Sequence, residues 1–547
     1  MNEKPTLAER ALYLFSPKRG NDRYNERLRR ERESEGAAAE ERKHGPRMNY
    51  NSHGASTTLN SLVGWLVDAG AAEDDIDLNA SQLRQRARDL YEGGGLARSG
   101  PETLTTSVVG WGIQPKPKID GEYLRMTDEA REEAEQAIGR EWKLWAENTM
   151  CDAERQQNFY GLQQLAFLSM LMSGDVFALF GMKENRRTPY QTTIRLLEAD
   201  RISTPDSSGD STSQETDGGG RIIDGVEIDK EGTVTRYHIA SRSPLAQNDN
   251  SELEWTAIEA FGKDTGYPNI LHIMTYERPE QRRGIPFVSA EIELIKQFSR
   301  YMNAELAGKV VSAMLTLFIT SNEDDGRAGM EDAVNEDEKV TDDELKLELA
   351  PGAIYDLPPG KNVTTVDPKR SDTQFEAFVN TMIMVIASSM GIPKEVLVKK
   401  YESNYTAARA SLLDFWRTVR VYRTRFNTSF NQPVYEQWLS EAVATGRIDA
   451  PGFFDDPAVR QAWCGCSWMG ASMGHVDPLK EVNAAAARIA NNITTQEQEA
   501  AEYNGNNLDE NLRQRRKEIN ALRDLDLATE GGAPNGDDGG EGDEEDE

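Results

Sequence analysis

The densest cluster of side chains that could bind a metal lies between residues 321 and 344. It contains the carboxylates of Glu323, Asp324, Asp325, Glu331, Asp332, Glu336, Asp337, Glu338, Asp342, Asp343 and Glu344. Carboxylate oxygens suit Ca²⁺ and Mg²⁺, but a calcium loop also requires the order D-x-[DN]-x-[DN]-G-x₅-E, which this segment lacks. We therefore interpret it as a solvated acidic insert and not as a metal site.

A second group of reactive side chains lies closer to the C-terminus. Cys464, Cys466 and His475 are zinc-ligand types, but a structural zinc site needs a further ligand pair at fixed spacing. Residues 470–474 read GASMG, which matches the G-x-S-x-G nucleophile motif. That motif requires an apolar strand before it and a helix after it, whereas here polar and glycine residues precede it and Pro478 follows closely. We interpret it as a chance match in a loop.

Histidines and glycines elsewhere give no stronger signal. His238 and His272 stand alone in strand-like segments, so we expect structural roles for both. Gly110 and Gly112 resemble part of a phosphate loop, but the full pattern G-x-x-x-x-G-K-[ST] occurs nowhere in the chain. The sequence therefore predicts no catalytic residue, no metal and no cofactor, and a protein that is not an enzyme.

Length and charge limit the fold and the partners. A chain of 547 residues is long enough for about two to four domains and a large core. Its net charge of −31 excludes a conventional DNA-binding protein, which holds phosphates with a basic surface. Three cysteines fit a reducing compartment, and the longest apolar run, residues 310–319, is about half of a membrane span. We expect a soluble protein, made inside the cell, with no membrane partner.

Helical and strand-like patterns alternate along the chain. Apolar residues at helical spacing predict helices over residues 80–91, 125–148, 159–172, 286–310, 479–491 and 507–528, and one after Pro101. Strand patterns occupy residues 176–182, 192–197, 225–228, 234–239 and 270–275, with two short strands between 345 and 367. Residues 204–220 are rich in Ser, Asp, Thr and Gly and predict an exposed loop. These patterns favour an α+β fold that is mainly helical.

The chain is organised around two helices between residues 371 and 443. The first ends at Gly391-Ile392-Pro393, because proline lacks an amide donor and disfavours helix in the residue before it. A polar segment, residues 394–406, follows and includes Lys399 and Lys400. The second helix carries an apolar stripe, and much of its remaining surface is basic: Arg409, Arg417, Arg420, Arg423 and Arg425.

An ordered series of short stretches resembles the lambda-type portal proteins of tailed bacteriophages. They are LRQRARDL at 83–90, VVGWGIQP at 108–115, LEADRI at 197–202, GVE at 225–227, HI at 272–273, RRGIP at 282–286, MGIP at 390–393, NYTAAR at 404–409, Trp468, and DP at 477–478. No single stretch is diagnostic, but their order is specific, and together they cover roughly residues 56–490.

The resemblance implies a portal fold with wing, stem, clip and crown regions, assembled as a ring around a central channel. Carried onto this chain, it gives a flexible charged arm (1–55), wing (56–285), first stem helix (286–310), clip with acidic insert (311–370), second stem helix (371–391), tunnel loop (392–405), wing spine helix with a following wing segment (406–477), crown helices (478–528) and a disordered acidic tail (529–547).

The resemblance also implies a function and partners. Portal proteins of this family form a ring, usually of twelve subunits, at one capsid vertex of the virion. Double-stranded DNA is packaged through the ring by a separate terminase motor, retained, and later ejected. The implied partners are further copies of the chain, the DNA, the terminase large subunit, the major capsid protein and scaffold, and head-tail connector proteins, with assembly in the host cytoplasm.

Elementary geometry agrees with a ring of that size. Twelve helices, each about 10 Å across, give a circumference of roughly 120 Å and a clear bore near 28 Å, which is wider than a DNA duplex. The acidity of the chain also fits, because DNA that must slide should make few phosphate contacts, each of which adds affinity through counterion release.

Candidate contact residues follow from this assignment. The DNA-facing tunnel loop contains Val398, Lys399, Lys400, Tyr401, Glu402 and Asn404. We hypothesise that Lys399 and Lys400 touch phosphates transiently, the alternative being that they are solvated loop lysines. Arg409, Arg417 and Arg420 are candidates for contacts with DNA or, more readily, with acidic neighbours across subunits. The clip surface that faces the motor or connector contains Glu331, Asp332, Glu336, Asp337 and Glu338.

Two other classes of protein remain as alternatives. A metal-dependent DNA-processing enzyme would need carboxylates at fixed spacing on ordered elements. In this chain they concentrate in the insert and the tail. Another minor head structural protein, such as a scaffold, would be made mostly of long polar helices, which the aromatic content and the predicted strands argue against.

Overall fold

The computed structural model describes residues 70–205, 213–216, 219–246, 251–313, 317–321, 361–365, 375–401, 405–473, 478–504 and 508–524, together with positions 18, 23, 26 and 61. The chain divides into two compact units, Met1–Gly70 and Ala71–Glu547. In the first unit, Lys18, Arg23 and Glu26 are helical and exposed. The rest of the predicted arm, the acidic clip candidates and the predicted tail (529–547) lie outside the described residues.

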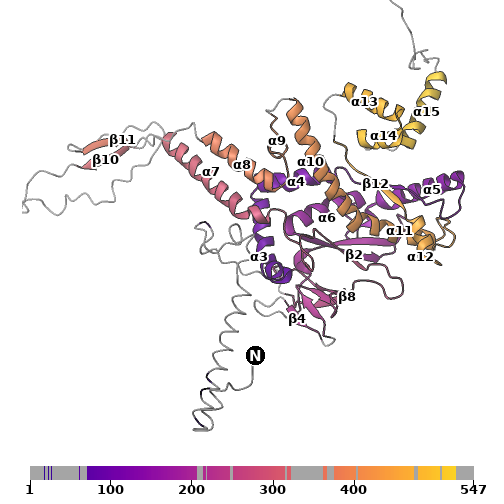
Figure 1. The fold of residues 1–547 in the computed structure, drawn as a ribbon, viewed down its shortest axis with the longest axis horizontal. Helices are drawn as coiled ribbons and strands as arrows, with labels where there is room; N and C mark the ends of the chain where they lie inside the picture. Colours follow the sequence, from indigo (N-terminus) through magenta and orange to yellow (C-terminus); the bar gives the residue numbers. More distant parts are fainter. Residues whose placement is uncertain are drawn as a thin grey trace, which may run out of the picture. The chain divides into compact units, whose positions relative to one another are not determined.

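The second unit opens with helices α3 (Ala72–Glu92), α4 (Leu96–Val108), α5 (Asp128–Ala146) and α6 (Phe159–Ser173) (Figure 1). Glycines at 93–95 separate α3 from α4, as predicted. The predicted start of α3 at residue 80 is wrong, because Glu73, Asp74 and Asp75 supply a first turn whose negative charge favours a helix N-terminus. The helix predicted to follow Pro101 likewise begins before it and contains it.

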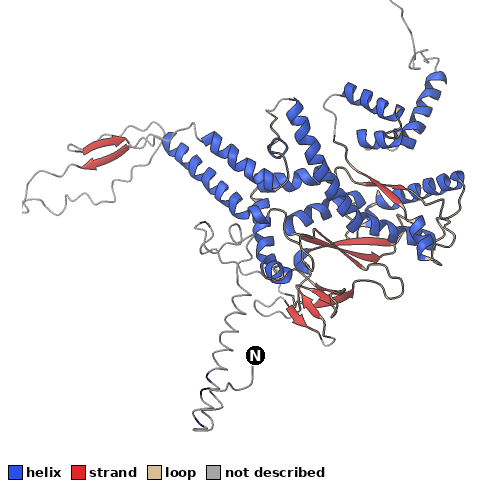
Figure 2. Ribbon diagram, in the orientation of Figure 1, coloured by secondary structure: helices blue, strands red, loops and turns tan. Residues whose placement is uncertain are grey.

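Two antiparallel sheets come next in the chain (Figure 2). One has the order β3-β2-β9 and consists of β2 (Asp175–Met182), β3 (Thr192–Glu198) and β9 (Ile270–Met274). The other is a meander of β4 (Ser213–Glu215), β5 (Arg221–Ile223), β6 (Val226–Ile228), β7 (Val234–Ala240) and β8 (Trp255–Glu259).

Within these two sheets the strand predictions are confirmed, but β4, β5 and β8 were not expected. The predicted loop over residues 204–220 is wrong where β4 pairs with β5. The last strand, β8, lies at the edge of its sheet with Thr256 and Ala257 exposed, so it lacks the alternation that marks a half-buried strand. The expected fold class, α+β and mainly helical, is confirmed.

The main core is aromatic and joins segments far apart in the sequence. Trp142 of α5 lies 5.0 Å from Trp145, 5.3 Å from Phe159 of α6 and 5.0 Å from Trp438 of α11 (Gln432–Ala444), measured between ring centroids. Each of these side chains is nearly fully buried, which stabilises the fold by roughly 2–3 kcal/mol apiece. A second core, with Phe177, Tyr237, Ile239 and Ile270, lies between the two sheets.

Helices α7 (Ile292–Ala313) and α8 (Phe375–Ser389) lie side by side (Figure 1), with the Tyr301 ring 4.8 Å from that of Phe378. The predicted start of α7 at residue 286 is wrong. The Phe287 amide donates to the Leu171 carbonyl at 2.9 Å, which ties an irregular stretch to the end of α6. A 3₁₀ turn (Ser289–Glu291) then leads into a helix of 22 residues, about 33 Å long.

Of the two strands predicted between residues 345 and 367, the second is β11 (Lys361–Thr365). It pairs antiparallel with β10 (Leu317–Ser321). The partner strand therefore comes soon after α7 in the sequence, and not within residues 345–367 as predicted. The residues predicted as the first strand lie outside the described part of the chain.

The helix after the break is α10 (Tyr405–Phe426), which passes through a π-helical turn (Asn427–Asn431) into α11. The chain then forms α12 (Pro457–Trp463), β12 (Cys466–Met469), α13 (Pro478–Ala490), α14 (Gln496–Asn504) and α15 (Leu508–Asp524). Strand β12 pairs with β1 (Gln114–Pro117). Within the described residues, no helix combines the length and apolar character that a bilayer span requires.

The entry to α7 depends on two glycines in contact. Gly174 has φ +91° and its missing Cβ would lie 2.5 Å from the Gly284 backbone. We therefore predict that Gly174→Ala destabilises the protein by more than about 2 kcal/mol. The alanine would strain the backbone, and its Cβ would clash with backbone atoms, which cannot move aside as a side chain can. Chemical unfolding followed by tryptophan fluorescence measures the change.

Gly139 in α5 provides the matched control, because a Cβ there would meet nothing within 4 Å. Gly139→Ala is expected to stabilise the protein by up to about 1 kcal/mol, the helix preference of alanine over glycine. Equal unfolding midpoints for the two variants would contradict this account of the α6–α7 junction.

Candidate functional site

The break after α8 is a Schellman turn. Gly391 has φ +64°, its amide donates to the Ser388 carbonyl at 3.1 Å, and the Ile392 amide donates to the Ala387 carbonyl at 3.0 Å. Pro393 then precedes a new helix. The predicted helix end at Gly391-Ile392-Pro393 is therefore confirmed.

The segment predicted as a loop, residues 392–405, contains a short helix, α9 (Lys394–Val398). The loop prediction is wrong for these residues because Ile392, Val396 and Leu397 are buried, and the Ser99 hydroxyl donates to the Leu397 carbonyl at 2.7 Å. The segment is thus anchored on α4 by one side.

The exposed candidates follow this anchor directly. Lys399 takes the left-handed conformation (φ +58°), and the Lys400 amide donates to the Glu395 carbonyl at 3.1 Å. Lys399 and Lys400 are exposed, as are Val398 and Tyr401, with 38% and 59% of their surfaces accessible. Glu402 and Asn404, the other two candidates, lie outside the described residues. The structure therefore presents two adjacent ammonium groups at the end of a fixed turn.

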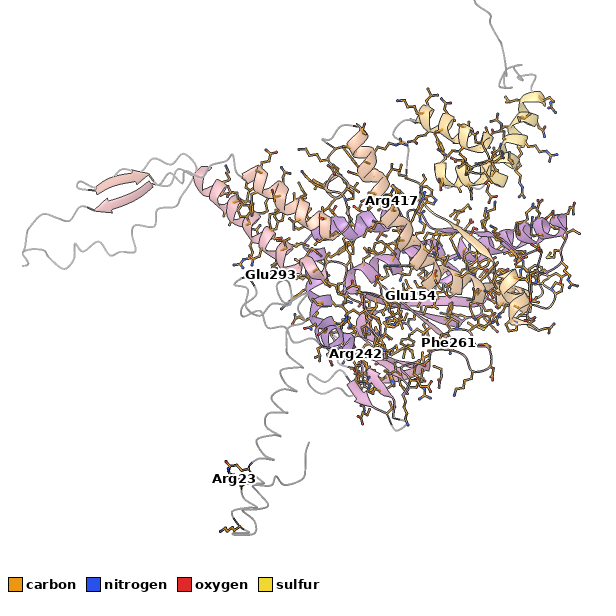
Figure 3. The ribbon with its side chains drawn as sticks, viewed as in Figure 1. Arg23, Glu154, Arg242, Phe261, Glu293 and Arg417 are labelled. Carbon is orange, nitrogen blue, oxygen red and sulfur yellow. The ribbon has the colours of Figure 1, made fainter. Side chains whose placement is uncertain are left out.

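The candidate arginines of α10 pair with carboxylates of the same chain. Arg409 lies 2.7 Å from Glu481 of α13, and Arg420 lies 3.3 Å from Glu502 of α14. Arg417, labelled in Figure 3, lies 3.6 Å from Asp414 one turn earlier on α10. The predicted pairing with acidic neighbours thus occurs here within one chain, and pairing across subunits stays a prediction.

Arg423 has a different role. It is largely buried, and its guanidinium donates to the carbonyls of Ser107, Val108 and Ala471 at 2.8–2.9 Å. Burial lowers the pKa of Arg423 to about 10, helped by the neighbouring Arg420. It ties the end of α4 to the segment after β12 and is not available to a ligand.

A buried charge cluster lies behind the entry to α7. Arg283 is fully buried and pairs with Asp175 at 2.7 Å and with Asp224 at 2.9 Å. Its guanidinium also donates to the carbonyls of Ala199 and Ile202. His272 contacts Asp175 at 3.2 Å. The cluster thereby fixes Arg283, in the segment that leads into α7, to β2, β9 and the β5–β6 turn.

Two arginines of α3 complete this cluster. Arg84 pairs with Asp200 at 3.1 Å and with Asp224 at 2.7 Å, and Arg88 also pairs with Asp200. The guanidinium charges of Arg84, Arg88 and Arg283 therefore balance the carboxylates of Asp175, Asp200 and Asp224. Removing one partner would leave a buried charge uncompensated, at a cost of roughly 3–5 kcal/mol.

The sequence analysis did not identify this cluster, although the signal was present. Arg84, Arg88, Asp200, His272 and Arg283 all belong to the short stretches on which the portal resemblance was based. The structural roles expected for His272 and His238 are confirmed, since His238 lies 2.9 Å from Glu227.

The cluster controls the protonation of its members. Burial alone would raise the pKa of Asp175, but the Arg283 guanidinium and the His272 hydrogen bond outweigh it and hold the pKa well below its usual range. Burial lowers the pKa of His272, so its imidazole is neutral despite the adjacent carboxylate.

Asp77 of α3 lies near this cluster but is not one of the three aspartates whose charges the arginines balance. It is 3% exposed, and neither of its carboxyl oxygens has a hydrogen-bond partner among the residues that the structure describes. Burial, together with the charges of Asp224 and Glu73, raises the pKa of Asp77 to about 7, against the opposing effect of Arg283 and Arg84. Asp77 therefore titrates close to neutral pH.

The residues considered for zinc or nucleophilic chemistry have structural contacts. Burial raises the pKa of Cys464 to about 12, and the Cys464 carbonyl accepts from Gln432. A strand, β12, does precede the GASMG stretch, contrary to expectation, because pairing with β1 stabilises it. His475 lies outside the described residues, and among the described ones no three His, Cys, Asp or Glu side chains form a group that could hold a metal.

Sequence comparisons identify similar proteins over most of the chain. Residues 58–423 match the family described as "Phage portal protein, lambda family". The chain is 24% identical to the portal protein of Escherichia phage N15 over 464 residues, covering 80% of this chain and 84% of that protein. It is 22% identical to portal protein B of Escherichia phage lambda over 467 residues, covering 82% and 85%.

The solved structures found by comparison come from gene transfer agent particles. A chain from the virion of the native particle shares 13% identity and a TM-score of 0.41, covering 67% of this chain and 81% of that chain. A chain from the neck of the native particle, computed with C12 symmetry, shares 11% identity and a TM-score of 0.39, covering 77% and 92%.

Asp77 generates a prediction about pH. Because its pKa is higher in the folded state than the ordinary value of 3.8, its contribution to stability is full at low pH and is lost as pH rises through about 7. Asp77→Asn should therefore gain stability relative to the unchanged protein as pH rises, by about 2 kcal/mol between pH 5.5 and 8. Urea unfolding at a series of pH values measures this difference.

Asp74→Asn is the matched control, because Asp74 lies on the same helix in its exposed first turn. That variant should stay at a constant offset from the unchanged protein across the same pH range. An offset for Asp77→Asn that is equally constant would contradict the role of Asp77 as a titrating group.

Proposed function

This chain belongs to the lambda family of phage portal proteins, and on that premise we propose that about twelve copies form a closed ring around a channel for double-stranded DNA. The observation that carries the proposal is the family match over residues 58–423, which spans α3 to α9 and most of α10. The ring would occupy one vertex of the phage capsid, after assembly in the host cytoplasm.

Exposed apolar side chains on the α7–α8 pair support a ring. Leu306 and Val310 of α7 are 65% and 46% exposed, and Phe378, Met384 and Val385 of α8 are exposed to a similar degree. Apolar patches of this kind mark interaction surfaces. In the proposed ring, the neighbouring α7–α8 pair would cover them, and the two helices would form the stem.

The remaining regions would take the roles that the family implies. The elements from α3 to β9 would form the wing, with α10 as its spine, and α13–α15 would form the crown. The acidic candidates between Glu331 and Glu338 would face the terminase large subunit during packaging and the head-tail connector afterwards. The wing and crown would face the major capsid protein and scaffold.

The segment after α9 would face the channel. Its anchoring through Val396 and Leu397 and its exposed ammonium groups support transient contact with phosphates. Two lysines per subunit on an otherwise acidic protein would steady the duplex without the affinity that many phosphate contacts give. Such a protein guides DNA, and a separate motor supplies the work.

The proposal treats the chain as a structural protein. A metal-dependent DNA-processing enzyme is the competing function, and it is tested directly by incubating the purified protein with plasmid and Mg²⁺ or Mn²⁺. Cleavage of the plasmid that depends on the added metal would overturn the assignment as a structural protein. Another minor head protein would give intact plasmid but no closed rings.

The ring generates the next prediction, tested by electron microscopy of the purified protein in end-on views. We expect closed rings of about twelve subunits with a bore wider than a DNA duplex. Leu306→Glu should raise the protein concentration needed for assembly by tenfold or more, because burying a leucine of this exposure contributes about 1.5 kcal/mol per interface.

Leu245→Glu serves as the control for ring assembly. Leu245 has a comparable exposed side chain, 46% accessible, but lies in the loop after β7. Rings that persist for both variants at the same concentration would argue against α7 as the subunit interface. Monomers of the unchanged chain at every salt and protein concentration would contradict self-assembly.

The lysines give a separate prediction. Lys399→Gln with Lys400→Gln should lower DNA retention in assembled particles several-fold and leave ring formation unchanged, because the proposed contacts are with DNA and not between subunits. Lys230→Gln with Lys263→Gln removes the same charge from exposed turns of the wing and is expected to have no effect. Unchanged packaging and retention in the Lys399–Lys400 variant would refute the tunnel contact.

A further inference from the structure

The three C-terminal helices, α13 to α15, contact the rest of the protein without a buried core. None of the described residues from 478 to 524 is buried. We call α13 to α15 the C-terminal module. Leu479 and Ile493 of this module are 74% and 71% exposed, so such apolar side chains do not hold it in place. By contrast, the opposite side of α10 buries Phe415, Val419 and Phe426.

Ion pairs connect the module to the body. Arg409 and Arg420 of α10 pair with Glu481 and Glu502, and Lys116 of β1 pairs with Glu497. In each pair the body supplies the cation and the module supplies the carboxylate. The module also has an internal pair, Arg488 with Glu499, which joins α13 to α14 and keeps the two helices together.

Two of these pairs are exposed to water. The Arg420–Glu502 pair is about two-thirds exposed on both sides, and Glu497 is about half exposed in its pair with Lys116. The Arg409–Glu481 pair is partly buried, with side-chain exposures of 35% and 13%. Exposed ion pairs of this type typically contribute 0–1 kcal/mol each and weaken with salt. The docked arrangement is therefore held by a modest electrostatic free energy, which a competing polyanion can exceed.

The arginines of α10 are spaced so that a polyanion such as DNA could bind several of them at once. Arg409 and Arg420 are 11 residues apart, about three helical turns, so they lie on one face of α10, roughly 16 Å from each other. Arg417 is 60° around the helix from Arg420 and is 82% exposed. Duplex DNA presents about one phosphate per 1.7 Å of its axis, so this span faces several phosphates.

We propose that the C-terminal module is a charge-held cover, and that double-stranded DNA displaces it by taking over the guanidinium groups of Arg409 and Arg420. The glutamates of α13 and α14 then act as substitutes for phosphate. Arginine suits the exchange because its guanidinium binds carboxylate and phosphate with the same geometry. The inference rests on the proposed function in one respect, namely that DNA passes close to the ring.

Zero-length carbodiimide cross-linking of the full chain tests the exchange. The reagent joins Lys116 to Glu497 only while the module is docked, and mass spectrometry quantifies the cross-linked peptide. Adding a 30-base-pair duplex at low salt should reduce this cross-link at least threefold. Lys296 and Asp89, an exposed pair between α7 and α3 at 3.6 Å, provide the internal control and should cross-link equally with and without DNA.

A charge variant gives an independent readout. Glu481→Gln with Glu502→Gln should raise the affinity for the duplex about tenfold, measured by fluorescence anisotropy. Glu132→Gln with Glu133→Gln on α5 changes the net charge equally, at exposed positions, and should raise it less than twofold. Adding Arg409→Gln and Arg420→Gln to the first variant should cancel the gain.

Several results would overturn the proposal. These are a Lys116–Glu497 cross-link that persists at saturating DNA, equal gains in the two glutamine variants, or a gain that survives loss of both arginines. Failure to bind the duplex at any salt concentration would also overturn it. Ring formation, scored by electron microscopy on the same samples, separates these outcomes from a failure of the proposed function.

Discussion

Between the two sheets and α3, the fully buried guanidinium of Arg283 donates to Asp175 and to the carbonyls of Ala199, Ile202 and Asp224. A guanidinium away from water must find a partner for each donor, because an unpaired buried charge costs several kcal/mol. These partners come from β2, the turn after β3 and the β5–β6 turn, so one side chain fixes the relative placement of both sheets. Arg283 also stands directly before the Gly284 contact and the irregular stretch that leads into α7. The direction in which α7 leaves the two sheets is therefore set by a buried ion cluster and a glycine contact, not by the helix itself.

The same cluster explains what sequence reasoning could and could not supply. The apolar runs of α6 and β2 were predicted to within a residue or two, because each run is continuous and Gly174 separates the two. The cluster residues were noticed only as parts of family-like stretches. Nothing in the spacing of Arg84, Asp200 and Arg283 says that they meet, since they are brought together by tertiary folding across nearly 200 positions.

At several places where the predictions were wrong or missed an element, a contact outside that element decided the structure. Helix α9 exists within a polar segment because Val396 and Leu397 find a surface on α4. Strand β11 pairs with β10 across 39 intervening residues, from Ser321 to Lys361. The short helix α14 has no pronounced apolar face, and its pairing through Glu499 with Arg488 is a feature of the docked module. Periodicity detects burial against a core, and these elements are placed by other contacts.

Charge is also distributed in a way that separates stability from binding. Three cations matter for stability: Arg84 and Arg283 are buried, Arg423 is largely buried, and each is held by several partners. On another face of α10, Arg409, Arg417 and Arg420 pair with carboxylates at positions that water reaches at least in part. In a chain of net charge −31, a basic face left without such carboxylates would attract DNA persistently. A carboxylate that can be exchanged lowers that affinity without removing the cation, because phosphate must first displace it. An acidic protein that has to let DNA slide can thus retain phosphate-binding groups and still release the duplex.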